Sequence, residues 1–203
     1  MEAPVPQRPP KPRAAAPGQT RGPWRVLDTR EVYRNPWIRV REDSVLRPDG
    51  RPGIYGVVEF EPAVGVVALG DDGAVYLVGQ YRYPTDSYSW EIVTGYADAG
   101  EEPLAAAQRE LREEAGLSAG SWTALGHIEI SNSVTDQVGF LYLAQDLSAV
   151  RAAPDETEQL EVRRMPLGEA LAQAQESAIF DGFSLAGLYR AWHYLRGDLR
   201  PAG

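Results

Sequence analysis

Hydrophobic and polar residues alternate along two early stretches of the chain, residues 24–33 and 37–46. An alternation with a period of two is typical of strands that are buried on one face only. Asn35-Pro36 separates the two stretches and Pro48-Asp49-Gly50 follows the second, and both segments favour turns. The pattern therefore predicts a small antiparallel sheet over residues 24–60.

Two denser apolar stretches come next, at residues 64–69 and 74–83, with Asp71-Asp72-Gly73 between them. A continuous apolar run that ends in a turn signal indicates a strand covered on both faces. We expect these two stretches to pair as a hairpin in the central sheet. Further strands are expected at residues 124–130 and 138–144.

Helical patterns follow and alternate with these strands. Residues 103–115 begin with a proline and are followed by Gly116, which are favoured residues at the start and after the end of a helix. Apolar positions at helical spacing predict two more helices, at residues 167–175 and 184–195. The order of elements predicts an α+β fold. Neither common glycine-rich phosphate loop is present in the sequence.

The first 22 residues differ in composition from the rest. They are rich in Pro, Ala and Arg, carry a charge of +3 (four basic residues less Glu2), and lack the apolar segment of a signal peptide. We interpret residues 1–22 as a disordered tail and expect a cytoplasmic protein. With a net charge of −9, the remainder carries −12, which argues against nonspecific nucleic-acid binding. No apolar run approaches the ~18 residues that a membrane span needs.

The chain has no cysteine and two histidines, so thiolate metal sites and cysteine nucleophiles are excluded. Any metal ion must be held mainly by oxygen. In the helix predicted at residues 103–115, Glu110, Glu113 and Glu114 lie at i, i+3 and i+4, within about 100° of arc. Their repulsion requires a cation. Either Mg²⁺ or Mn²⁺ supplies it in a metal site, or arginines of the same helix supply it on a solvated face.

The loop before this helix favours the metal site. Gly95 is followed at fixed intervals by eight further residues, and the nine positions together match GX5EX7REUXEEXGU, where U is aliphatic. The segment resembles the Nudix box at every defined position. The eight residues are Glu101, Arg109, Glu110, Leu111, Glu113, Glu114, Gly116 and Leu117.

The resemblance implies a Nudix fold, which is an α/β/α sandwich around a mixed sheet, preceded here by the N-terminal antiparallel sheet. We expect three parts: the tail at residues 1–22, a dimerising sheet at 23–60, and a Nudix hydrolase domain at 61–200. The resemblance also implies Mg²⁺-dependent hydrolysis of a nucleoside diphosphate linked to another moiety, with Mn²⁺ as a substitute metal.

The family pattern also assigns roles to individual residues. Glu110 and Glu114 are expected to bind the metal ion, with Glu113 contributing to the cluster and the backbone carbonyl of Thr94 adding a neutral oxygen. The remaining box residues support the site. Arg109 and Glu101 orient the cluster through a salt bridge, and Gly95 lies beside it.

Residues 80–103, QYRYPTDSYSWEIVTGYADAGEEP, resemble the branch that contains ADP-ribose pyrophosphatases and other nucleoside diphosphate sugar hydrolases. In that branch Arg82 is expected near the pyrophosphate, where a guanidinium binds phosphate oxygens in pairs. Trp90 and Glu91 are expected at the edge of the substrate or of the dimer. For Trp90, ordinary core packing is an equal alternative to stacking on a base.

One loop departs from this branch. Where the branch has Ser-Pro-Gly and then a glutamate that can serve as general base, residues 131–137 read SNSVTDQ. The glutamate position falls on Gln137, whose amide cannot accept a proton. Three alternatives remain: Asp136 is the base, a box glutamate (Glu110 or Glu113) is the base, or turnover is slow.

The sequence thus predicts a homodimeric enzyme that hydrolyses a nucleoside diphosphate sugar of the ADP-ribose or GDP-mannose type. The products would be a nucleoside monophosphate and a sugar phosphate. The base, the sugar, the number of metal ions and the phosphorus attacked stay open. The alternative is a Nudix-fold module that binds such a nucleotide without cleaving it, which Gln137 favours and the intact box disfavours.

Overall fold

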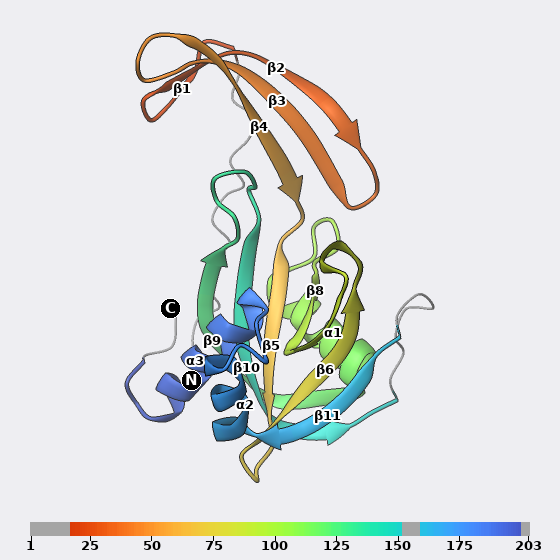
Figure 1. The fold of residues 1–203 in the computed structure, drawn as a ribbon. Coiled ribbons are helices and arrows are strands. Elements are labelled where there is room, and N and C mark those ends of the chain that lie inside the picture. Colours follow the sequence, from red (N-terminus) through yellow and green to blue (C-terminus); the bar gives the residue numbers. More distant parts are fainter. Residues whose placement is uncertain (1–16, 152–158, 200–203) are drawn as a thin grey trace. The chain divides into compact units, whose positions relative to one another are not determined.

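The computed structural model describes residues 17–151 and 159–199, and Figure 1 shows their strands and helices. These residues form two compact units. We call residues 17–61 with 129–138 the sheet A unit, and residues 62–128 with 139–199 the sheet B unit. In the part of the chain that the structure describes, no helix has the length and apolar character needed to cross a membrane.

Sheet A is antiparallel and confirms the small N-terminal sheet that the alternation predicts. Its strands lie in chain order. Val26 and Val45 pair across two of them and are buried, with Trp24 and Tyr55 packed against them. The strands are β1 (Thr20–Arg21), β2 (Trp24–Arg34), β3 (Ile38–Leu46) and β4 (Pro52–Phe60).

The structure shortens the predicted tail. Thr20 and Arg21 form β1 and pair with Arg25 and Trp24, because Gly22 turns the chain at φ 57°. The prediction of a tail that reaches residue 22 is therefore wrong at its end. Residues 1–16 lie outside the described residues.

Sheet B is mixed. Its main order is β11-β6-β5-β10-β9, with β7 paired to β6 and β8 paired to β5. β5 and β10 run parallel, and every residue of β5 is buried. The strands are β5 (Ala63–Leu69), β6 (Ala74–Arg82), β7 (Ser87–Glu91), β8 (Val93–Tyr96), β9 (Leu117–Glu129), β10 (Val138–Ala149) and β11 (Glu161–Pro166), with a 3-10 turn, η1 (Tyr83–Thr85), between β6 and β7.

The predicted hairpin is present but short. β5 and β6 pair only at Ala68 with Tyr76 and Leu69 with Val75. Beyond that point β8 pairs with β5 and β7 pairs with β6, so the two strands separate. β9 begins seven residues before the predicted start at residue 124. The polarity pattern indicates none of these non-local pairings.

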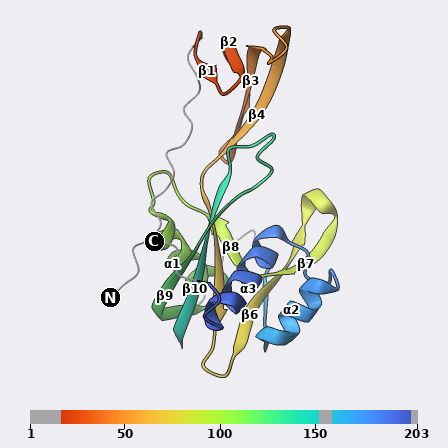
Figure 2. The same cartoon turned by 90° about the vertical axis from the view of Figure 1, so that its left-hand side faces the viewer.

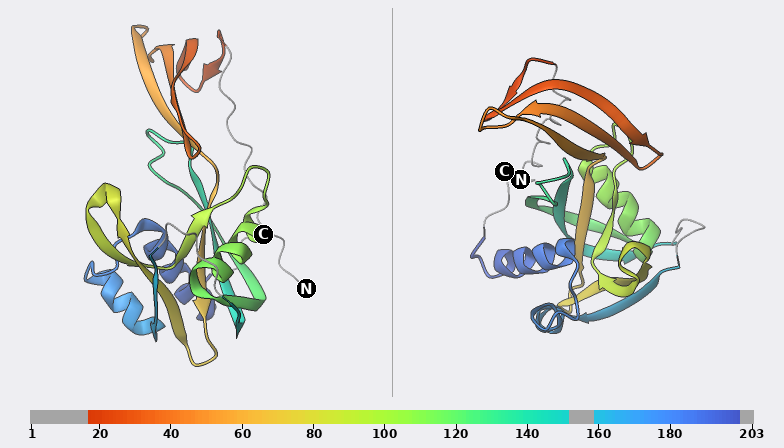
Figure 3. Two further views of the ribbon diagram at one scale, coloured as in Figure 1. Left: turned by 90° about the vertical axis from the view of Figure 1, so that its right-hand side faces the viewer. Right: turned by 45° about the horizontal axis from the view of Figure 1, so that its top comes forward.

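Three helices cover sheet B. They are α1 (Pro103–Ala115), α2 (Leu167–Gln175) and α3 (Gly182–Leu195). α1 lies on one side of the sheet, and α2 and α3 lie on the other (Figures 2 and 3). The main core fills the space between the sheet and α2 and α3. This arrangement confirms the α/β/α sandwich around a mixed sheet.

The loop between β9 and β10 belongs to the sheet A unit. The Val58 N–H donates to the Val134 carbonyl at 2.9 Å, and the Tyr55 hydroxyl donates to the Ser133 carbonyl at 2.8 Å. The loop is therefore bound to β4 through backbone and side chain. The predicted division, a sheet at residues 23–60 followed by a domain at 61–200, did not anticipate that this loop groups with the N-terminal sheet.

Candidate active site

α1 carries the three box glutamates beside its buried face. Leu111 is fully buried, and only 5% of Glu114 is exposed. Gly116 ends the helix at φ 62°, a left-handed conformation that glycine adopts without strain. A buried carboxylate is costly unless it has a hydrogen-bond or ion-pair partner. The partners of each glutamate therefore show which of them is held in place and by what.

Arg109 is the cation that joins the box residues. Its Nη1 lies 2.8 Å from Glu110 Oε1 and 2.9 Å from Glu113 Oε2, and its Nη2 lies 3.0 Å from Glu101 Oε2. Nη2 also donates to the Tyr96 carbonyl at 2.8 Å. The hydrogen bonds that Arg109 donates lower the pKa of Glu101, and the same contacts with Glu101, Glu113 and Glu110 raise the pKa of Arg109. The expected Arg109–Glu101 salt bridge is present, and it ties the loop before α1 to the helix.

β8 lies against the same helix. The Thr94 N–H donates to Glu114 Oε2 at 3.1 Å. At Gly95, a β-carbon would overlap the carboxylate carbon of Glu110. The glycine of the box therefore leaves the space that the Glu110 carboxylate occupies. Thr94, Gly95, Glu110 and Glu114 thus lie close together, and their roles in metal binding stay a prediction.

Gly95→Ala is expected to lower kcat/KM by about 10²-fold, since a displacement of about 1 Å in a reacting group can cost that much. The added methyl must push the Glu110 carboxylate away. Gly56→Ala is the matched control because a β-carbon there meets nothing within 4 Å. Steady-state kinetics of nucleotide-sugar hydrolysis with both variants measures the difference. Equal kcat/KM for the two variants would show that the position of Glu110 is not held by Gly95.

The side chains and the carbonyl expected to bind metal are chemically suited to a hard divalent ion. Glu110, Glu113, Glu114 and the carbonyl of Thr94 offer oxygen only, which Mg²⁺ and Mn²⁺ prefer. Among the residues with described positions, no three Asp, Glu or His side chains converge as a preformed metal cluster. The hydrogen bonds explain this, because Arg109 holds Glu110 and Glu113 while the Thr94 N–H holds Glu114.

Arg82 lies at the end of β6 and is paired with Glu91 of β7. Arg82 Nε donates to Glu91 Oε1 at 3.0 Å, and its Nη2 donates to Glu91 Oε2. Nη2 also lies 3.4 Å from the Thr94 hydroxyl. Burial lowers the pKa of Arg82, but the hydrogen bond and ion pair with Glu91, together with the charges of Asp181 and Glu114, raise it overall. The Arg82 side chain is 39% exposed while the Glu91 side chain is 3% exposed, so Arg82 is open to an approaching anion.

Trp90 points to the other face of β7. The Arg163 guanidinium lies 4.1 Å from the centre of its ring, and the Tyr88 ring meets it edge-on at 5.8 Å. A β-carbon at Gly79 would come within 2.8 Å of the same ring. Trp90 also packs against the main core. These surroundings are typical of core packing. The proposed function therefore does not use Trp90 to stack on the nucleotide base.

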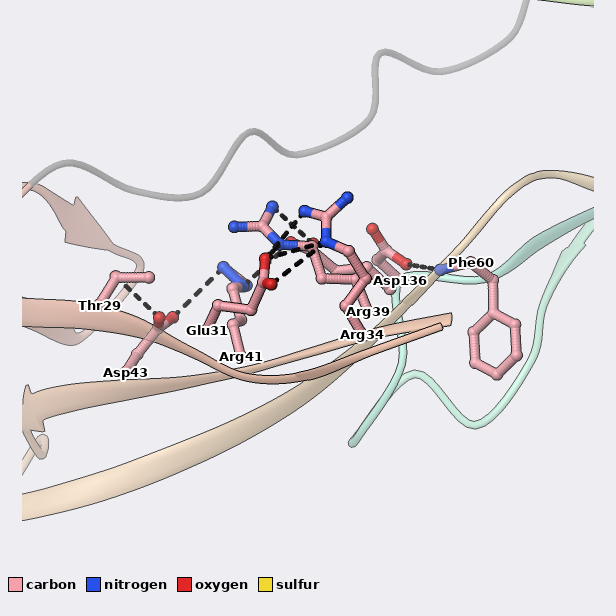
Figure 4. Close-up of polar contacts among 9 residues, drawn as sticks. Thr29, Glu31, Arg34, Arg39, Arg41, Asp43, Phe60 and Asp136 are labelled. Atoms are coloured by element: carbon pink, nitrogen blue, oxygen red, sulfur yellow. Dashed lines mark hydrogen bonds and ion pairs between the residues drawn. The ribbon is translucent and has the colours of Figure 1, made fainter. Parts of the chain in front are cut away.

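Asp136 lies in the sheet A unit. Its Oδ1 accepts the Phe60 N–H at 3.0 Å, and its own N–H donates to the Val58 carbonyl at 3.3 Å (Figure 4). The neighbouring Gln137 is only 9% exposed. Asp136 is therefore held against β4, while the Gln137 carbonyl accepts the Ile130 N–H at 3.1 Å. The role of Asp136 as general base stays a prediction.

Sheet A also contains a ladder of charged side chains that the sequence analysis missed (Figure 4). The Arg41 and Asp43 side chains are 3% and 5% exposed and lie 3.5 Å apart, and Arg41 Nε lies 3.1 Å from Glu59 Oε1. The Thr29 hydroxyl donates to Asp43 at 2.8 Å. These contacts join β2, β3 and β4. The alternation of charges at every second residue of β3 is the signal that could have indicated it.

A second set that sequence reasoning missed is Asp181 and Ser184, at the start of α3. Asp181 caps the helix, and its Oδ2 accepts from both the Ser184 N–H and the Ser184 hydroxyl at 2.9 Å. Ser184 is fully buried. An aspartate three residues before a serine, ahead of an apolar helical stretch, is a helix-start signal that could have been noticed.

Two protein families match this chain. The NUDIX domain matches residues 59–182, and the nucleoside diphosphate sugar hydrolase N-terminal domain matches residues 24–58. The chain therefore belongs to the Nudix family, which confirms the prediction from the box. It is a Nudix hydrolase with relatives of the ADP-ribose pyrophosphatase type.

Individual relatives agree with this assignment. The chain is 32% identical to an ADP-ribose pyrophosphatase of Mycobacterium tuberculosis, over 87% of this chain and 86% of the relative. It is 30% identical to the ADP compounds hydrolase NudE of Escherichia coli, over 86% of this chain and 95% of the relative. A crystal structure of an ADP compounds hydrolase superimposes with a TM-score of 0.75 at 26% identity, covering 87% of this chain and 97% of that chain.

Proposed function

We propose that this protein hydrolyses the pyrophosphate of a nucleoside diphosphate sugar, of the ADP-ribose or GDP-mannose type, in a reaction that requires Mg²⁺ or Mn²⁺. One observation carries the proposal. A single arginine, Arg109, holds Glu101, Glu110 and Glu113 together while Thr94 and Gly95 lie against the same helix. The matching relatives, two of which are named for ADP-ribose or ADP compounds, support the substrate class.

In the proposed reaction, the oxygen of a water molecule forms a bond to one phosphorus, and the bond from that phosphorus to the bridging oxygen breaks. The proton of the water passes to a base, and the products are a nucleoside monophosphate and a sugar phosphate. Glu110, Glu113, Glu114 and the Thr94 carbonyl would hold the divalent ion. When bound, such an ion neutralises charge on phosphate oxygens and makes water more acidic.

The chain's own residues perform the remaining steps. Arg82 binds the pyrophosphate oxygens, because it stays cationic and partly exposed while Glu91 fixes the plane of its guanidinium. Arg109 holds the glutamates in place and does not contact the substrate. For the base that removes the proton, we propose Asp136, with Glu110 and Glu113 as the alternatives.

A substrate panel tests the proposal. Purified protein is incubated with ADP-ribose, ADP-glucose, GDP-mannose and UDP-glucose, in the presence of Mg²⁺, of Mn²⁺ or of EDTA. We expect metal-dependent release of a nucleoside monophosphate and a sugar phosphate in equal amounts from at least one compound. Tight binding by calorimetry with no cleavage of any compound would instead support the alternative, a nucleotide-binding module, which Gln137 favours.

A homodimer is the second part of the proposal, because the resemblance to nucleoside diphosphate sugar hydrolases implies pairing through the N-terminal sheet. Sheet A exposes large apolar side chains, among them Trp37 at 75% and Ile54 at 70%, which suits a surface that pairs. Light scattering at micromolar concentration is expected to give twice the chain mass of 22.3 kDa. A variant without residues 1–16, which still contains β1, should also be a dimer. A monomeric mass for the full chain would contradict the proposal.

A further inference from the structure

The chain changes its partner strand at Ile92. β7 pairs with β6 up to Glu91, and β8 pairs with β5 from Val93 onward. The N–H of Ile92 therefore lies at a break between two ladders, and the Ser184 hydroxyl accepts it at 2.9 Å. Ile92 is 1% exposed and Ser184 is not exposed at all. A buried N–H at a strand break needs such a partner, and α3 supplies it.

Asp181 fixes the direction of this hydroxyl. A serine hydroxyl has one proton to donate and two lone pairs that accept. The Ser184 hydroxyl donates to Asp181 Oδ2 at 2.9 Å, so a lone pair is left for the Ile92 N–H. The same Asp181 oxygen accepts the Ser184 N–H and caps the helix. The start of α3 and the strand break are thus joined by one short chain of hydrogen bonds.

The residues beside the break belong to the candidate active site. Glu91, one residue before Ile92, holds the Arg82 guanidinium. Thr94, two residues after Ile92, donates its N–H to Glu114. Movement of the backbone at Ile92 would therefore move the partners of both Arg82 and Glu114.

Electrostatics also link Asp181 to this region. Burial raises the pKa of Asp181, and the nearby Glu91 carboxylate adds to the rise while the Ser184 hydrogen bonds and Arg82 oppose it. The charge of Asp181 in turn favours the cationic form of Arg82. Asp181 thus lies close enough to the Arg82–Glu91 pair to interact electrostatically with Arg82.

We propose that Ser184 and Asp181 are positioning residues of the hydrolase site, which set the break at Ile92 so that Glu91 holds Arg82 and Thr94 holds Glu114. This inference rests on the proposed function. In this proposal neither Ser184 nor Asp181 contacts the substrate. Both residues act through the backbone of residues 91–94. Loss of the Ser184 hydroxyl would therefore loosen Glu114, which binds the metal ion, and Arg82, which binds the pyrophosphate, at the same time.

The test compares Ser184→Ala, Asp181→Ala and Asp181→Asn with the unmodified full chain. Partners that orient metal ligands typically change metal affinity or activity by about 10- to 100-fold when lost. We expect Ser184→Ala and Asp181→Ala to raise the Mg²⁺ concentration at half-maximal rate, the dissociation constant for Mn²⁺ by calorimetry, and the KM for the nucleotide sugar. Asp181→Asn keeps an oxygen that accepts from Ser184 and should recover most of the Mn²⁺ affinity.

Two controls separate positioning from a general loss of stability. Ser89→Ala removes another buried hydroxyl, which has no hydrogen-bond partner among the described residues, and should leave all three quantities unchanged. Ile179→Val shortens a fully buried side chain just before Asp181 and lowers the melting temperature without touching the Ser184 bonds. Measurements are made well below the lowest melting temperature of the set.

The outcomes distinguish this inference from the proposed function. If the unmodified chain cleaves a nucleotide sugar and the Ser184 and Asp181 variants match Ile179→Val in Mn²⁺ affinity and KM, the positioning role is wrong while the function stands. If the unmodified chain cleaves none of the compounds, the proposed function is wrong. The Mn²⁺ titrations alone then test whether Ser184 and Asp181 position the metal-binding residues. A Mn²⁺ dissociation constant raised in Ser184→Ala and Asp181→Ala but not in the controls supports the inference in both cases.

Discussion

Glu114→Gln is expected to lower kcat by about 10²- to 10³-fold, because a metal-held pyrophosphate loses several kcal/mol of transition-state stabilisation when a carboxylate ligand becomes neutral. The fold should persist. The amide oxygen of glutamine can still accept the Thr94 N–H, which Glu114 Oε2 accepts at 3.1 Å. Since a like charge beside Glu110 is also removed, the melting temperature without Mg²⁺ should hold or rise. Steady-state kinetics at saturating Mg²⁺ and thermal unfolding in EDTA measure the two effects.

Glu102→Gln is the matched control for this variant. It makes the same chemical change at the cap of the same helix, where the Glu102 side chain forms no capping hydrogen bond. We expect near-normal kcat from it. Hydrolysis by Glu114→Gln at the rate of this control would remove Glu114 from the metal site.

Asp136→Asn is expected to lower kcat by about 10²-fold or more, within the range of 10² to 10⁴ for the loss of a positioned general base. Asparagine keeps an oxygen that accepts the Phe60 N–H, so the loop should stay on β4. Gln137→Glu should then add little, because the chain already has its base. Glu129→Gln, a carboxylate-to-amide change at the end of β9 just before this loop, is the control. Measuring kcat for all three on one confirmed substrate tests the assignment.

Two other results would change the assignment of the base. If Gln137→Glu raises kcat by 10²-fold or more while Asp136→Asn has no effect, the base belongs at position 137 and the natural enzyme is slow. If both variants match the unmodified chain, the base lies on α1, with Glu110 or Glu113 as the candidate. The melting temperature of Gln137→Glu must be checked, because Gln137 is only 9% exposed and a buried carboxylate is costly.

Local signals were enough to predict the box helix and the shared face of its glutamates. Pro103 and Gly116 set its ends, and three glutamates at i, i+3 and i+4 share one face whatever surrounds them. The same holds for β2 and β3, whose alternation predicts the strands to within a residue or two. In each case the information lies within a few residues along the chain, because helix periodicity and strand alternation are local properties.

Partners far apart in sequence were not predictable in this way. The alternation on β7 shows that Trp90 and Glu91 face opposite sides, but only the structure shows Arg163 over Trp90 and Arg82 against Glu91. Likewise, the helix-start signal at Asp181 does not reveal that Ser184 accepts the N–H of Ile92.

The sequence by itself therefore determined the class of protein, the box helix and the placement of its three glutamates on one face. Tertiary structure decided which partners those groups have. It placed the loop of Asp136 with sheet A, joined β7 and β8 to different strands, and put α3 against the break between them. The physical reason is that strand pairing and packing join residues far apart along the chain, such as Tyr55 with Ser133, 78 positions away, and Ile92 with Ser184, 92 positions away. No local pattern of polarity encodes which distant strand or helix will satisfy a given N–H.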